Sequence, residues 1–139
     1  MTTMNDLALR IVTAIFKQEA MPDSYTNPGN LRDCPWFPFK SIDGKFQRAY
    51  PDGTAVNFIT QEGTGEKFWA PRTRAEGIVG AHHVVALHIA EGNTLRQLIG
   101  GWAPAADGNN TETYIKNVKE WAGVVNEDTP LWSYCEVAV

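Results

Sequence analysis

The sequence lacks the features that mark several common protein classes. No run of residues approaches the roughly 18–20 consecutive apolar residues of a membrane span. No block of Lys and Arg is available to meet a phosphate backbone, and 12 basic residues stand against 16 acidic ones, a net charge of −4. The polar start carries no signal-peptide pattern, and there is no internal repeat or low-complexity tract. We therefore expect no membrane and no nucleic-acid partner, and synthesis in the cytoplasm.

Metal-binding and redox patterns are equally scarce. Cys34 and Cys135 are the only cysteines and form no CxxC pair, so we favour two reduced thiols over a disulfide. His82, His83 and His88 do not have the HExxH spacing of a metal site, and His82 falls on an apolar helix face. The sequence therefore predicts no metal and no cofactor.

What the sequence does contain suits one globular domain. Its 139 residues are 43% hydrophobic and include five Trp, four Tyr and six Phe, which is enough for a core and an aromatic-lined groove. We expect a single domain over residues 1–139, with a core at about 7–125 and a tail at 126–139.

Apolar spacing and turn residues predict an α+β fold, mostly helical with a small antiparallel β region. Two or three short strands are expected between residues 39 and 70, among turns such as Asp43-Gly44. Capping residues predict the helix boundaries, with capping boxes at Thr73–Glu76 and Thr94–Gln97. The first expected helix begins at Asn5 or Asp6 and ends at Glu19 or Ala20. Three more are expected: Thr73 to Glu91, Thr94 to Gly100-Gly101, and Asn109 to Ala122.

Glu19 is the most informative single residue. It follows Ile15 by four positions and Phe16 by three, which places it on the apolar stripe of the first helix. An apolar setting and the negative end of the helix dipole both penalise an ionised carboxylate and raise its pKa. A carboxylic acid that stays protonated near neutral pH is suited to general acid catalysis. From spacing alone, we favour a solvated residue at a frayed helix end, and the polar segment that follows Glu19 shifts the balance toward a catalytic role.

Two polar segments supply candidate substrate-binding residues. Just after Glu19, a rigid turn holds Asn27, Asn30 and Arg32, whose amides and guanidinium suit sugar hydroxyls and N-acetyl groups, although a plain Asx-turn has the same pattern. In the second segment, Trp102 offers an apolar wall for a sugar ring, and the loop that caps the last helix offers hydrogen bonds from Asn110 and Thr111. Tyr114 lies on the apolar face of that helix, so its hydroxyl needs a partner: a carboxylate on another helix, or water.

These motifs resemble a known family. A helix ending in Glu, then NPGNLR, a short β region, a Thr-x-x-Glu-Gly helix start, Gly-Asn-Thr-Leu, and WAP followed by NNTETYI look like the lysozyme-like domain of phage virion and prophage proteins. That domain is related to lytic transglycosylases and goose-type lysozymes, and the resemblance runs from about Leu7 to Val125. It implies a lysozyme fold and cleavage of the β-1,4 bond between N-acetylmuramic acid and N-acetylglucosamine. Glu19 matches the catalytic glutamate, 27–30 the Asn-rich turn, and Tyr114 the late tyrosine.

The resemblance leaves the reaction type open. A hydrolase needs a second carboxylate, for which Asp43, Asp52 and Glu62 are candidates. A transglycosylase needs none, and we favour it over a hydrolase. Glycan strands of peptidoglycan and other virion proteins are the expected partners, at the bacterial cell wall. The alternatives are a non-catalytic structural or glycan-binding virion module with the same fold and, less favoured, a toxin-like effector. The acidic charge, poorly suited to an anionic wall, supports the non-catalytic module.

Overall fold

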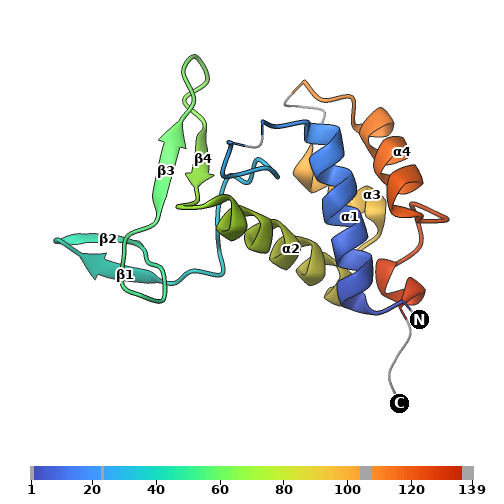
Figure 1. Ribbon diagram of the computed structural model, residues 1–139, viewed down its shortest axis with the longest axis horizontal. Coiled ribbons are helices and arrows are strands. Elements are labelled where there is room, and N and C mark those ends of the chain that lie inside the picture. The colour runs from blue at the N-terminus through green and yellow to red at the C-terminus, as the bar shows by residue number, and fades with distance from the viewer. Residues whose placement is uncertain (1, 23, 104–107, 136–139) are drawn as a thin grey trace. The chain divides into compact units, whose positions relative to one another are not determined.

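The computed structural model describes residues 2–22, 24–103 and 108–135. Within these residues it is a small α+β protein with four α-helices and two small antiparallel sheets, as the sequence predicted (Figure 1). Its contacts divide it into two compact units: Met1–Met21 with Ala81–Val139, and Pro22–Gly80. We call these the helical unit and the hairpin unit. The expected single domain over 1–139 stays a prediction.

Helix α1, Met4–Glu19, supplies one wall of the helical unit's core. Thr3 caps it rather than Asn5 or Asp6: the Thr3 hydroxyl accepts a hydrogen bond from the Asp6 backbone N–H, and the Asp6 carboxylate accepts one from Thr3 N–H. The helix ends at Glu19 because Ala20 adopts a left-handed conformation with φ of 51°. The buried stripe is Leu7, Ala8, Ile11, Val12, Ala14 and Ile15.

Helix α4, Thr111–Ala122, packs against α1 and against α3, Leu95–Trp102 (Figure 1). Where it packs against these helices it buries Tyr114, Ile115, Val118 and Ala122. A short 3-10 helix, Leu131–Tyr134, follows and buries Leu131. Tyr114, which the sequence places on the apolar face of the last helix, therefore lies on its core face, whereas Trp121 is 40% exposed.

The hairpin unit contains two antiparallel hairpins, one more strand than the largest number expected. Strands β1 (Phe39–Ile42) and β2 (Lys45–Arg48) meet at the Asp43-Gly44 turn, and β3 (Asn57–Thr60) pairs with β4 (Lys67–Ala70). Each strand has only four residues, too few for a clear alternating pattern, which is why the sequence did not separate them. Trp69 is buried at the centre of the unit, in edge contact with Trp36 and Phe37.

Helix α2, Arg74–Ala90, spans the boundary between the units, which falls after Gly80. In the hairpin unit it lies against the turn at 26–28 so closely that a Cβ at Gly77 would stand 1.9 Å from the Thr26 carbonyl oxygen. Gly80 is similarly close to the Trp69 ring. In the helical unit, Val85 and Ile89 are buried.

Several expected boundaries need correction. The Thr73 hydroxyl caps α2, but the Glu76 carboxylate bonds to Arg72 instead of completing a capping box. Helix α3 does not stop at Gly100-Gly101 but continues to Trp102, because both glycines take helical conformations. Helix α4 is capped by Asn110 rather than Asn109. The Thr94–Gln97 capping box is confirmed.

Candidate functional site

Glu19 and Tyr114 meet between α1 and α4. The Tyr114 hydroxyl donates a hydrogen bond of 2.9 Å to Glu19 Oε1, joining residues that are 95 positions apart in the chain. Of the two partners that the sequence left open for the Tyr114 hydroxyl, a carboxylate on another helix or water, the structure has the carboxylate, Glu19. Both side chains project between the packed helices of one unit because each sits on the apolar stripe of its own helix.

Burial sets the acid–base character of this pair. Desolvation raises the pKa of Glu19 above its ordinary value of 4.5, and the hydrogen bond from Tyr114 partly opposes that rise. Burial and the neighbouring Glu19 carboxylate also raise the pKa of Tyr114, so its hydroxyl keeps its proton and acts as a donor. A half-buried carboxyl held by one neutral donor can give a proton to an acceptor and take it back.

Two further contacts, which the sequence did not reveal, hold α1 and α4 in register beside this pair. The Asn117 side-chain amide donates to Gln18 Oε1 at 2.9 Å, and the Lys17 ammonium lies 4.3 Å from the centroid of the Trp121 ring. Their only sequence signal is spacing: the contacts on α4 follow Tyr114 at helical intervals. They fix the relative position of the segments that carry Glu19 and Tyr114.

The remaining candidates of the helical unit lie near the two ends of the loop between α3 and α4. Trp102 is half-buried at the last position of α3. The Asn110 side chain accepts from the Thr113 backbone N–H, and the Thr111 hydroxyl donates to the Ala103 carbonyl at 2.7 Å. Both polar side chains therefore hold the loop ends. Pro104 of the WAP motif and the rest of 104–107 lie outside the described residues.

In the hairpin unit, the NPGNLR turn is a structural element. Asn27 is fully buried: its amide donates to the carbonyls of Leu31 and Trp69, and its oxygen accepts from Leu31 N–H. Asn30 has a left-handed backbone, φ of 53°, and accepts a long bond from the Tyr25 hydroxyl. The structure thus gives Asn27 a role in folding, while the exposed Arg32 side chain stays accessible.

The three candidates for a second carboxylate lie in turns. Asp43 is at the tip of the β1–β2 hairpin, and Glu62 lies in the loop between β3 and β4; both are exposed. Asp52 is bound by the Arg72 guanidinium at 2.6 Å, which together with hydrogen bonds from Thr54 lowers its pKa to about 2.

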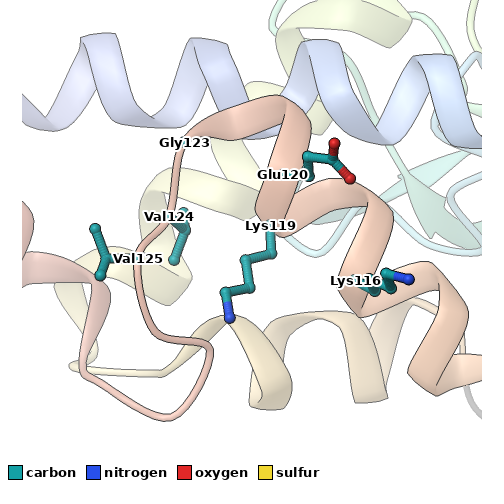
Figure 2. Close-up of a pocket in the computed structure, with 6 residues that line it drawn as sticks. All are labelled: Lys116, Lys119, Glu120, Gly123, Val124 and Val125. Atoms are coloured by element: carbon teal, nitrogen blue, oxygen red, sulfur yellow. The ribbon is translucent and has the colours of Figure 1, made fainter.

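A separate surface hollow of about 450 Å³ lies at the far end of α4 (Figure 2). It is formed by the last turns of the helix and the chain that follows it, from Lys116 to Val125. Lys119 within it is bound to Glu127 at 2.8 Å. The hollow contains none of the residues singled out from the sequence.

Comparison with models of protein families, with curated proteins and with solved structures finds no match. The assignment of function therefore rests on residues and geometry. In the described part of the chain, no cluster of His, Cys, Asp and Glu could hold a metal ion, and no helix is long and apolar enough to cross a membrane. Both cysteines are free thiols, and burial raises the pKa of Cys34 to about 12.

Proposed function

We propose that this protein cleaves the β-1,4 glycosidic bond between N-acetylmuramic acid and N-acetylglucosamine in peptidoglycan, on a lysozyme-like fold, with Glu19 as the catalytic acid and base. The observation that carries the proposal is the half-buried Glu19 carboxyl, whose pKa is raised by desolvation and which accepts a hydrogen bond from Tyr114. The glutamate and the tyrosine that resemble the family's site residues are thus in contact.

The proposed reaction is an intramolecular transglycosylation. Glu19 gives its proton to the glycosidic oxygen as the bond from that oxygen to muramic C1 breaks. The muramic 6-hydroxyl oxygen then bonds to C1, and the Glu19 carboxylate takes the hydroxyl proton, which closes a 1,6-anhydro ring and restores the acid. This route needs only one catalytic carboxyl group. Hydrolysis would need a second, and Asp52 is already bound by Arg72.

The test is digestion of purified peptidoglycan, with the fragments identified by mass spectrometry and Glu19→Gln as the matched variant. Gln keeps the size of the side chain and its acceptor for Tyr114, but cannot give a proton. We expect 1,6-anhydromuramic ends from the wild type and a loss of at least about 1,000-fold in rate for Glu19→Gln.

Other products lead to other conclusions. Reducing ends, one water heavier, would identify a hydrolase and direct attention to Asp43 and Glu62. Equal digestion by wild type and Glu19→Gln would remove Glu19 from the mechanism. If neither protein cuts a substrate that another muramidase digests, the non-catalytic module remains as the alternative.

A further inference from the structure

The hairpin unit carries an aromatic groove that the proposed catalysis does not use. Phe39 and Phe46 project from the same face of the first hairpin. Phe39 pairs with Arg48 and Phe46 pairs with Ser41, and alternate residues of a strand, such as 39 and 41, point to the same face. Their rings stack at a centroid distance of 5.4 Å and an angle of 18°. Phe46 is 75% exposed and Phe39 is 49% exposed, so this flat apolar surface is open to solvent.

The second hairpin adds another side to the groove. Phe58 of β3, which is 37% exposed, and Lys67 of β4 line this side of the groove. Together with the first hairpin they enclose a hollow of about 380 Å³. The Arg48 guanidinium lies 4.3 Å from the Phe39 ring centroid. Stacked rings that are exposed and held by a cation form a rigid platform, because little side-chain freedom remains to be lost when a ligand binds.

Charged side chains of both signs line the same groove. Arg48 binds the Asp33 carboxylate through two nitrogens at 2.9 and 3.1 Å. Arg32, which pairs with the Glu66 carboxylate at 3.4 Å, and Gln47 also line the groove. The lining thus contains three cations and one carboxylate, in a chain whose net charge is −4. Among the described residues, no carboxylate pairs with the third cation, Lys67.

We propose that this groove binds an acidic saccharide. Flat aromatic faces suit the C–H faces of a sugar ring, and a rim with both donors and acceptors suits hydroxyl groups, which do both. Lys67, the cation of the lining that no described carboxylate pairs with, suits a carboxylate substituent. A nucleic-acid strand fits less well, because Lys67 alone among the cations of the lining has no carboxylate partner in the described residues, and the hairpin unit has seven basic and seven acidic residues, too little excess positive charge for a phosphate backbone.

The test measures binding, in a Glu19→Gln background that keeps the ligand intact, by isothermal titration calorimetry. The probe is a muramic-acid-containing tetrasaccharide that carries its stem-peptide carboxylates, and neutral chitotetraose is the comparison. We expect Phe46→Ser to weaken binding of the acidic probe about three- to ten-fold. Lys67→Glu is expected to weaken it similarly and to leave binding of chitotetraose unchanged.

Two matched controls lie on the same hairpins. Ile59, which is 58% exposed, follows Phe58 on β3 and points to the opposite face of its hairpin. Lys45 precedes Phe46 on β2 and likewise points to the opposite face of its hairpin. Ile59→Ser and Lys45→Glu should leave binding unchanged. Because all four substituted side chains are exposed, thermal melts should stay close to that of the background protein.

Three outcomes would overturn the inference: unchanged binding in Phe46→Ser, equal losses in the controls, or binding of oligothymidylate in place of the saccharides. This test is separate from that of the proposed function, because binding is measured without cleavage. A protein that cuts nothing can still satisfy it, and one that cuts peptidoglycan can still fail it.

Discussion

At the scale of the residue, the protein places one carboxyl group where ionisation is costly. Glu19 ends a helix on its apolar side, and its partner Tyr114 offers a neutral donor rather than a cation. An arginine in that place would hold the carboxylate ionised and lower its pKa. Tyrosine relieves only part of the desolvation, so the carboxyl group can exchange a proton closer to neutral pH.

The cost of this placement predicts that Glu19→Gln stabilises the protein at neutral pH. The pKa of Glu19 is raised in the folded state, so protonated Glu19 favours folding. This contribution to the free energy of unfolding is complete below the pKa of the unfolded chain, near 4.5, and is lost as the pH rises through the pKa of the folded state. Gln does not titrate. We expect the melting temperature of the variant to exceed that of the wild type by about 1–4 °C at pH 7 and to match it near pH 4. A variant less stable at pH 7 would contradict this.

Removal of the Tyr114 hydroxyl should move the pKa of Glu19 upward. The hydrogen bond favours the ionised form, so Tyr114→Phe leaves desolvation unopposed, and we expect the pKa of Glu19 to rise. The measurement is an NMR titration of the Glu19 carboxyl carbon. Tyr134→Phe is the control, because that hydroxyl bonds to the Asn126 backbone and should leave Glu19 unaffected.

At the scale of the element, sequence signals that act over a few residues predicted most of the structure, whereas close packing between elements was not predicted. Capping residues and the 3.6-residue spacing locate the four α-helices of the described residues, because these signals lie within or next to the helices themselves. The Thr3–Asp6 capping box is also a local signal but was missed. The helical Gly100-Gly101 and the second hairpin were not predicted because glycine suits both a turn and a helix and four-residue strands show no clear alternation. Among the candidate site residues, Asn27 shows the limit: its amide type suited a sugar, but a β-strand carbonyl 42 positions away occupies it.

Close packing of α2 predicts that Gly77→Ala destabilises the protein. The new methyl group would meet the Thr26 carbonyl, a backbone atom that cannot turn aside, so we expect a loss of about 1–3 kcal/mol in the free energy of unfolding, measured in urea. Gly100→Ala on α3 is the control. It meets nothing within 4 Å and should stabilise the protein by about 0.5–1 kcal/mol. Equal effects would show that helix propensity alone decides.

At the scale of the whole molecule, charge is unevenly distributed. The helical unit has five basic and nine acidic residues, so it carries all of the net charge of −4, and the hairpin unit is balanced. Glu19 belongs to the acidic unit. A substrate that is itself anionic is therefore repelled at long range by the part of the protein proposed to cut it.

This repulsion predicts an unusual salt dependence for digestion of intact cell walls. Raising ionic strength from about 10 mM to about 150 mM shortens the screening length from roughly 30 Å to 8 Å, so the rate should increase, by about two-fold or more. The measurement is the initial rate of turbidity loss at several salt concentrations. A short neutral glycan substrate should show little change. A rate on walls that falls steeply with salt would contradict the prediction.

The division of the chain also orders events during its synthesis. The hairpin unit is one continuous stretch, whereas the helical unit begins before it and is completed after it. A ribosome therefore finishes residues 22–80 while α1 still lacks its packing partners. Because synthesis takes seconds, the hairpins have time to fold first. Glu19 meets Tyr114 only when most of the chain has emerged, so a product truncated before α4 would contain every residue that lines the groove but would lack the tyrosine of the acid–base pair.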